Sequence, residues 1–364
     1  MSDPVRVIIA DDSPFICRLL KQYLESDPSI SVVKTVHNGK EAVESVKTLK
    51  PNVLTLDLDM PVLDGISALK QIMAQCPTAV LLVSGVGKEG ARRTEEGLSI
   101  GAVDFIFKYS PDAQIPKSTL RRELIAKVKS AARVKVIRTI PSRLKKQAII
   151  GNISSLPPIP PASTAPASER LVVVGASTGG PLALKEMLSS LDPAFNFPLV
   201  IVQHMPERFT AILASQFGRI FPFPVKEASH GAPLIPGTVL IAPGNRHVLI
   251  SSDHCVHLSS APEVNGHRPS IDVTMQSAAR IFSSRCIGVI LSGMGHDGAE
   301  GLLAIYSSSG MTFAQSSESC VVDSMPMSAI QKGIVHYAGS PAEIGRWLTE
   351  KTLKKSPAAI KVTA

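Results

Sequence analysis

The sequence lacks any long hydrophobic run. Across its 364 residues, no stretch approaches the roughly 20 consecutive apolar residues that a membrane-spanning helix needs. The opening residues, MSDPVRVIIADDS, carry acids where a secretory signal would have basic and apolar segments. These absences predict a cytoplasmic protein that does not insert into a membrane.

Cysteine is also scarce. The five cysteines are far apart and include no C-x-x-C pair: Cys17, Cys76, Cys255, Cys286 and Cys320. An odd number of scattered cysteines argues against a disulfide framework or a zinc ribbon and favours buried thiols. His254 and His257 are close in sequence, but their odd separation would place them on opposite faces of a strand, which argues against a shared zinc ion.

Positive charge is confined to one part of the chain. Between Lys117 and Lys146 the net charge is +10, whereas the rest of the chain sums to −2. This basic segment runs into a stretch rich in Pro, Ser and Ala, Asn152–Arg170, and not into a helix-turn-helix pattern. We therefore expect a solvated helix face or linker, and no nucleic-acid partner.

The proline-rich stretch divides the chain. We expect a first domain at 1–130, a linker at 131–169, a second domain at 170–355 and a tail at 356–364. Both domains alternate short β-branched runs with amphipathic stretches. The runs are VRVIIA, SVVKTV, NVLTLD, AVLLVS and VDFIFK, then LVVVGA, PLVIVQ, GTVLIAP and CIGVILS. This pattern predicts an α/β fold, with a five-stranded parallel sheet in the first domain and a doubly wound, mostly parallel sheet in the second.

Polar residues follow four of the first domain's five predicted strands. The ends of the first, third, fourth and fifth strands carry Asp11-Asp12, Asp57, Ser84 and Lys108. Carboxylates gathered at one sheet edge repel one another unless a cation such as Mg²⁺ neutralises them. The lysine and the hydroxyl suit a phosphoryl group, and Asp57 is the natural acceptor. The alternative is that each aspartate merely caps a helix.

Four segments of this domain resemble a response-regulator receiver domain of flavodoxin-like fold. They are VIIADDSPFICRLL, VLTLDLDMPVLDGISAL, LLVSG and GAVDFIFK. The resemblance implies phosphorylation of Asp57 by a histidine kinase, with Ser84 as the switch hydroxyl and Lys108 as the phosphoryl contact. It also implies a Mg²⁺ site formed by Asp11, Asp12, Asp57 and the backbone carbonyl of Asp59.

Two residues depart from the receiver pattern. Tyr109 stands where the family usually has proline, and Gly85 follows the switch hydroxyl where an alanine- or serine-like residue is common.

The second domain opens with a glycine-rich turn, Gly175–Gly179, that fits G-x-S-x-G between a predicted strand and a predicted helix. The turn fits neither of the nucleotide-binding patterns G-x-x-x-x-G-K-[ST] and G-x-G-x-x-G. The turn is either structural or carries a nucleophile, Ser177. A nucleophilic serine needs a base and a group that orients the base. His204 directly follows PLVIVQ, and Asp297 follows CIGVIL within SGMGHDGAEG, whose glycines suit an oxyanion loop.

Other histidines are weaker candidates for the base. His296 adjoins Asp297, and adjacent side chains diverge, so this acid is poorly placed to orient it. His247 and His267 are more consistent with rim or substrate-contacting positions. The order Ser, His, Asp also differs from the Ser, acid, His order of α/β-hydrolases, which predicts a different fold with a convergent triad.

Five segments in order resemble the catalytic domain of chemotaxis receptor methylesterases. They are GASTGG, QHMPERFT, APGNRH, HRPSIDV and SGMGHDGAEG. A receiver followed by this domain is the architecture of the CheB family. The resemblance implies hydrolysis of glutamyl methyl esters and deamidation of glutamines on chemoreceptors, without a cofactor in the esterase domain. It assigns Ser177, His204 and Asp297 as the triad, the Met294 N–H as an oxyanion donor, and Thr178 as a lining residue.

The resemblance also implies control by the receiver, which covers the esterase cleft until Asp57 is phosphorylated. Two alternatives stay open at this point. The second domain could bind a partner without turnover, or it could act on another methylated protein.

Overall fold

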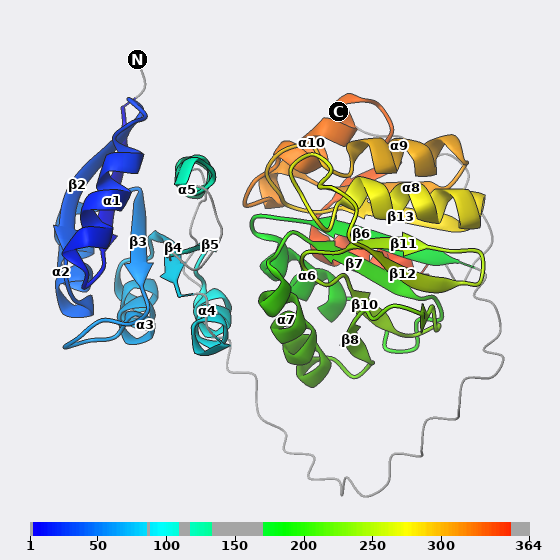
Figure 1. The fold of residues 1–364 in the computed structure, drawn as a ribbon, viewed down its shortest axis with the longest axis horizontal. Helices are drawn as coiled ribbons and strands as arrows, with labels where there is room; N and C mark the ends of the chain where they lie inside the picture. The colour runs from blue at the N-terminus through cyan, green and yellow to red at the C-terminus, as the bar shows by residue number, and fades with distance from the viewer. Residues whose placement is uncertain (1–2, 86–87, 109–116, 133–169, 351–364) are drawn as a thin grey trace, which may run out of the picture.

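The structure is a computed structural model of the chain. It describes residues 3–85, 88–108, 117–132 and 170–350. Figure 1 shows two α/β units side by side, the first in blue to teal and the second in green to red. Residues 133–169 of the predicted linker and the whole predicted tail lie outside the described residues, as does Tyr109. None of the described helices is both long enough and apolar enough to cross a bilayer.

The first unit is a parallel sheet with the strand order β2-β1-β3-β4-β5. The strands are β1 (Val5–Ala10), β2 (Ile30–Val36), β3 (Val53–Asp57), β4 (Ala79–Ser84) and β5 (Asp104–Phe107). Every residue of β3 and β4 is buried, because helices cover both faces of the sheet. The predicted flavodoxin-like, five-stranded fold is confirmed.

Five helices cover this sheet. They are α1 (Pro14–Leu24), α2 (Gly39–Leu49), α3 (Gly65–Gln75), α4 (Lys88–Ile100) and α5 (Lys117–Ala131). Ser13 caps α1, because its hydroxyl accepts a hydrogen bond from the first turn. Asp11 and Asp12 therefore do not serve as the α1 cap, and the capping alternative does not account for them.

The second unit is a seven-stranded sheet with the order β15-β14-β13-β6-β7-β10-β8, and every pair is parallel. The strands are β6 (Leu171–Ala176), β7 (Leu199–Gln203), β8 (Val225–Glu227), β10 (Val239–Ile241), β13 (Cys286–Ile290), β14 (Met311–Gln315) and β15 (Tyr337–Gly339). The four predicted strands form its centre. This confirms the predicted doubly wound, mostly parallel fold.

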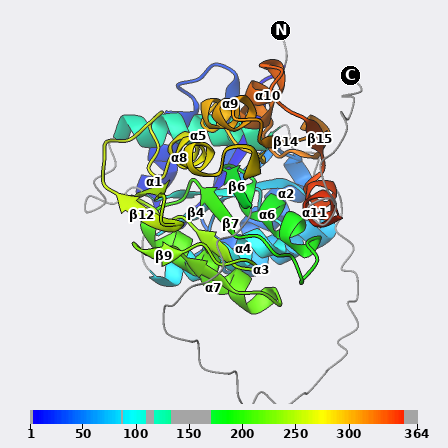
Figure 2. The same ribbon diagram turned by 90° about the vertical axis from the view of Figure 1, so that its right-hand side faces the viewer.

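Helices pack on both faces of the second sheet. They are α6 (Gly180–Ser189), α7 (Glu207–Ile220), α8 (Ile271–Phe282), α9 (Ala299–Ser307), α10 (Ser324–Gln331) and α11 (Pro341–Glu350), with 3₁₀ turns η1 (Ser283–Arg285) and η2 (Ser317–Ser319). In Figure 2, α8 and α9 lie above β6 and β7, and α7 lies below them. Leu171 and Val173 pack toward α8, whereas Val172 and Val174 pack toward α6 and α7, which explains the unbroken apolar run of β6.

A small antiparallel sheet was missed by the sequence analysis. Its strands have the order β11-β12-β9 and are β9 (Ala232–Pro233), β11 (His247–Ile250) and β12 (Cys255–Ser259). The strands are two to five residues long, too short for a clear alternating pattern. The chain leaves β12 through residues 260–270, a segment that borders the candidate active site.

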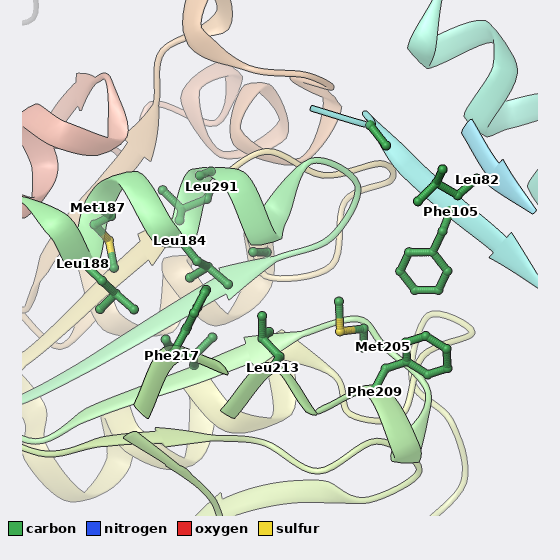
Figure 3. Packing of buried hydrophobic residues seen from close by; sticks show 14 of the residues in the cluster. Leu82, Phe105, Leu184, Met187, Leu188, Met205, Phe209, Leu213, Phe217 and Leu291 are labelled. Carbon is green, nitrogen blue, oxygen red and sulfur yellow. The ribbon is translucent and has the colours of Figure 1, made fainter. Parts of the chain in front are cut away.

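The two units share one hydrophobic cluster. Phe105 of β5 stacks on Phe209 of α7, with ring centroids 5.1 Å apart, and Phe107 meets the same ring edge-on at 4.8 Å. Figure 3 shows Phe105 facing Phe209 and Met205 across this junction. Helix α4 also packs against α6 and α7. The last strand and the α4 side of the first unit therefore rest on the second unit.

Candidate active site and receiver pocket

Three neighbouring strands of the second sheet, β13, β6 and β7, bring the predicted triad residues to one edge. The backbone N–H of His204 donates to the carbonyl of Ala176 at 3.0 Å, and the N–H of Ser177 donates to the carbonyl of Ser292 at 3.0 Å. Because parallel strands end at the same edge, residues distant in sequence become neighbours there. Ser177, His204 and the loop with Asp297 all follow these strand ends, as predicted.

Glycines allow the turn at Ser177 to lie against the neighbouring loop. Gly179 has a φ of 75°, and a Cβ at this position would come within 2.4 Å of Val321. A Cβ at Gly293 would come within 2.9 Å of the Ser177 Cβ. Gly293 therefore lets the loop after β13 approach the serine closely, and Gly179 lets Val321, which follows β14, pack against the same turn.

His204 and Asp297 form a buried pair. The Nε2 atom of His204 lies 2.8 Å from Oδ2 of Asp297, and their side chains are 7% and 1% exposed. A carboxylate can only accept, so Nε2 carries the proton and donates it in this bond. Within the described residues, His204 Nδ1 has no hydrogen-bond partner, and no direct hydrogen bond joins it to the Ser177 hydroxyl. Nδ1 is thus the nitrogen available to accept a proton.

Asp297 sits at the N-terminus of α8, where unpaired N–H groups favour an anion. Its carboxylate accepts hydrogen bonds from the N–H of Ile271 at 2.8 Å, the N–H of Asp272 at 3.2 Å and the hydroxyl of Ser270 at 2.9 Å. Burial alone would raise the pKa of Asp297, but His204 and these donors lower it below its usual value. Asp297 is therefore ionised at neutral pH. The sequence analysis missed Ser270 and the helix start, although SID in HRPSIDV is a capping pattern.

Two backbone N–H groups beside Ser177 are available for an oxyanion. The N–H groups of Gly293 and Gly295 donate to Val322 and to the Ser324 hydroxyl. By contrast, the N–H groups of Met294 and Thr178 donate to no protein acceptor within the described residues. Met294 is half-buried and Thr178 is buried.

A buried glutamine, missed by the sequence analysis, joins the two turns. The Gln203 side-chain amide donates to the carbonyls of Ser177 at 2.9 Å and His204 at 3.2 Å. It thereby links the backbone of the predicted nucleophile to that of the predicted base. Its position at the last residue of β7 was the only signal in the sequence.

The other histidines considered as site residues lie in different environments. His296 is exposed, whereas His267 is half-buried and stacks on the ring of His204. The expectation of a rim or substrate-contacting role for His247 is wrong, because its ring is buried and bonds the N–H of Ser270 and the carbonyl of Pro262.

His254 and His257, the two histidines considered as a zinc pair, contact different residues. His254 is in a turn with a φ of 59° and lies near Phe282, whereas His257 lies in β12 near His230. Among the described residues, the only cluster of potential metal ligands is Asp11, Asp12 and Asp57.

The carboxylates predicted at the edge of the first sheet converge. One oxygen from each of Asp11, Asp12 and Asp57 lies within 4.8 Å of the others. Lys108 Nζ lies 2.7 Å from Asp57 and 3.2 Å from Asp11. Burial raises the pKa of Asp57 to about 6, although the Lys108 ammonium opposes the shift. An all-oxygen cluster with too little positive charge fits a hard divalent cation such as Mg²⁺.

Two other predicted receiver residues bond elsewhere. The Ser84 hydroxyl donates to the carbonyl of Gly90 at 3.1 Å and contacts the Thr94 hydroxyl at 2.7 Å, so it engages α4 and not Asp57. The Asp59 carboxylate pairs with Arg93. The receiver resemblance assigns the metal contact to the backbone carbonyl of Asp59, and the ion pair of its carboxylate is compatible with that assignment.

A polar contact links the receiver to the turn at Ser177. Asp104 of β5 is buried and bonds Lys127 of α5 at 3.4 Å. Burial raises the pKa of Asp104, while Lys127 and the hydroxyl of Thr178 oppose that shift. Thr178 follows the predicted nucleophile directly, so the first unit touches the candidate active site itself.

Two family models match the chain. The model described as CheB methylesterase matches residues 172–348, and the response regulator receiver domain model matches residues 7–119. The protein-glutamate methylesterase/protein-glutamine glutaminase of Symbiobacterium thermophilum is 39% identical over 344 residues, 91% of this chain and 92% of that protein. The protein of the same name from Halalkalibacterium halodurans is 39% identical over 338 residues, 92% and 94% of the two chains.

One solved structure is also similar, that of the CheB methylesterase catalytic domain of Thermotoga maritima. It is 38% identical, with a TM-score of 0.48, and the match covers 49% of this chain and 96% of that one. From the family models and the two relatives, we conclude that this chain belongs to the CheB methylesterase family, with a receiver domain ahead of the methylesterase domain.

Proposed function

We propose that this protein removes methyl esters from glutamyl side chains of chemoreceptors and deamidates receptor glutamines, under control of its receiver domain. Family membership supports the reaction class. The observation that carries the assignment is the buried hydrogen bond between His204 and Asp297 at the sheet edge that also presents Ser177.

The proposed mechanism follows from the available atoms. Nδ1 of His204 takes the proton of the Ser177 hydroxyl as its oxygen attacks the ester carbonyl. The imidazolium then gives this proton to the leaving methoxide, so methanol departs and an acyl-enzyme remains. Water attacks that ester by the same route and releases the glutamate and Ser177. With an amide substrate, ammonia leaves instead of methanol.

Asp297 and two backbone donors support these steps. The ionised carboxylate holds the Nε2 proton and stabilises the imidazolium that forms, without taking a proton itself. The N–H groups of Met294 and Thr178 are the candidate donors to the tetrahedral oxyanion, because neither is used within the described residues. This assigns to Met294 the role that the resemblance implied and gives Thr178 a backbone role in addition to lining the site.

The receiver domain is proposed to control the esterase activity through phosphorylation of Asp57. Asp57 attacks the phosphorus of a histidine kinase's phosphohistidine, the P–N bond breaks, and an aspartyl phosphate forms. Asp11, Asp12, Asp57 and the Asp59 carbonyl would hold Mg²⁺, which when bound neutralises phosphoryl and carboxylate charge. Lys108 binds the phosphoryl oxygens. Ser84 must leave the Gly90 carbonyl to reach them, which couples phosphorylation to α4.

The same coupling of phosphorylation to α4 would expose the esterase site to its substrate. Helix α4 and strand β5 both rest on the methylesterase domain, and Asp104 lies beside Thr178. A shift of α4 would weaken that junction and uncover the turn at Ser177. The unphosphorylated receiver is therefore proposed to restrict access to the site.

The test is methanol release from methyl-labelled receptor by the full-length chain, with and without Mg²⁺ and a phosphodonor. Ser177→Ala is expected to abolish release, and Asp57→Ala is expected to remove only the stimulation. Ser189→Ala, which changes an exposed serine on α6, is the matched control and keeps normal turnover. Normal turnover by Ser177→Ala would overturn the catalytic assignment.

A further inference from the structure

The flat face of the His204 ring is covered by a second imidazole. His267 stacks on it with ring centroids 3.8 Å apart and an interplanar angle of 12°. None of the roles assigned above to Ser177, His204 and Asp297 uses this ring. It is half-buried and belongs to the segment between β12 and α8.

The backbone around His267 is fixed on both sides. His267 exchanges two hydrogen bonds with Val264, at 3.0 and 3.1 Å. The next residue, Arg268, accepts from the Asn245 N–H at 3.0 Å and donates to the Asn245 side chain at 2.7 Å. The backbone that carries the ring is therefore fixed by contacts that do not involve His204.

Hydrogen bonding alone leaves the His204 ring incompletely constrained. Its Nε2 bond to Asp297 fixes one atom of the ring, and Nδ1 has no partner within the described residues. A parallel aromatic face in contact adds a constraint on the ring plane. Because Nδ1 must face the Ser177 hydroxyl for proton transfer, the plane matters to the reaction.

His267 can hold this position without adding charge. The ionisable groups that face it are His204, Asp297 and His296 of the esterase domain and Arg122 on α5 of the receiver. Burial, more than any neighbouring group, lowers the pKa of His267 to about 4 although Asp297 opposes the shift, so the ring is neutral at pH 7. A second cation against His204 would oppose the proton that His204 must accept, whereas a neutral ring does not.

We propose that His267 is a positioning residue that sets the plane of the His204 imidazole, so that Nδ1 is aimed at Ser177. This inference rests on the proposed function. The residue acts through His204 and needs no contact with the substrate.

The experiment compares His267→Ala with His267→Phe in the full-length chain, assayed for methanol release with Mg²⁺ and a phosphodonor. His267→Ala is expected to lower kcat about tenfold with unchanged KM, because the base is misplaced. It is also expected to shift the acid limb of the kcat/KM profile, because the contact between the imidazolium and Asp297 changes when the ring plane is no longer fixed. His267→Phe keeps a flat ring, so its kcat is expected to stay within about twofold of the wild-type value. The acid limb of its kcat/KM profile should not shift.

His257→Ala is the matched control, since it removes an imidazole whose recorded contacts are with His230 and Asp253. A fluorophosphonate probe that labels Ser177 gives a second readout without receptor, and its labelling rate should fall only in His267→Ala. Wild-type kcat and pH profile in His267→Ala would overturn the proposal, as would a rise in KM alone. If Ser177→Ala also retained turnover, the proposed function would fail, which distinguishes the two failures.

Discussion

Asp57 of the receiver and Asp297 of the esterase domain are each 1% exposed; Asp57 ends β3, and Asp297 lies in the loop after β13. Their pKa values nevertheless move in opposite directions. The pKa of Asp57 rises to about 6, whereas that of Asp297 falls below its usual value. Equal burial therefore does not determine the charge of a carboxyl group here.

The difference lies in the donors that each carboxylate receives. Asp297 accepts from His204, a serine hydroxyl and backbone N–H groups at a helix start. Asp57 accepts from Lys108 and one backbone N–H, and it faces the carboxylate of Asp11. Protein donors thus compensate the charge of Asp297, whereas the receiver carboxylates exceed the positive charge beside them. A site built to receive a phosphoryl group and a cation needs that deficit.

The largest expected effect comes from removing the charge of Asp297. Asp297→Asn should lower kcat about 10⁴-fold, the loss that the same change causes in a Ser-His-Asp protease, because His204 loses its required tautomer. Methanol release from labelled receptor measures it. Asp57→Asn without phosphodonor is the control and should keep basal activity. A loss below tenfold for Asp297→Asn would show that the two carboxylates do not differ in the way proposed.

The next effect is on stability, and its sign differs between the two carboxylates. The folded-state pKa of Asp57, about 6, exceeds the ordinary value of about 3.9, so its ionised form destabilises the fold at pH 8 by up to about 3 kcal/mol. This penalty fades as the pH falls from 6 to 4. Asp57→Asn in EDTA should therefore raise the melting temperature at pH 8 and much less at pH 4.5.

Asp297→Asn should do the reverse. Its lowered pKa means that the ionised form stabilises the fold above pH 4, so the variant should melt lower throughout pH 5 to 8. Shifts of the same sign in both variants would contradict the comparison.

The smallest effect tests the junction between the two regions. Phe105→Ala removes the ring that stacks on Phe209, an interaction of about 0.5–1.5 kcal/mol beyond burial, so the basal esterase rate should rise about two- to tenfold. Leu24→Ala, in the buried face of α1, destabilises the receiver away from the junction and is the control. An unchanged basal rate in Phe105→Ala would remove the proposed role of this contact.

The sequence predicted the central strands well, because runs such as LVVVGA and AVLLVS are buried on both faces. It missed β8, β14, β15 and the antiparallel sheet; β8, β9 and β15 have only two or three residues, too few to show a period. Strand ends located Ser177, His204 and Asp297 because parallel strands share one carboxyl edge. The environment of His247 was predicted wrongly, since a histidine at the end of the polar segment APGNRH gives no sign of being buried.

The sequence by itself determined two α/β units, the polar residues at their strand ends and the glycines that permit close turns. These features are local, because they depend on hydrophobic period and backbone freedom along the chain. Only the tertiary structure decided that Nε2 of His204 faces Asp297, that Ser84 bonds toward α4, and that His267 covers the His204 ring. Each of these depends on side-chain directions and donors from segments that meet only after the sheets and helices have packed.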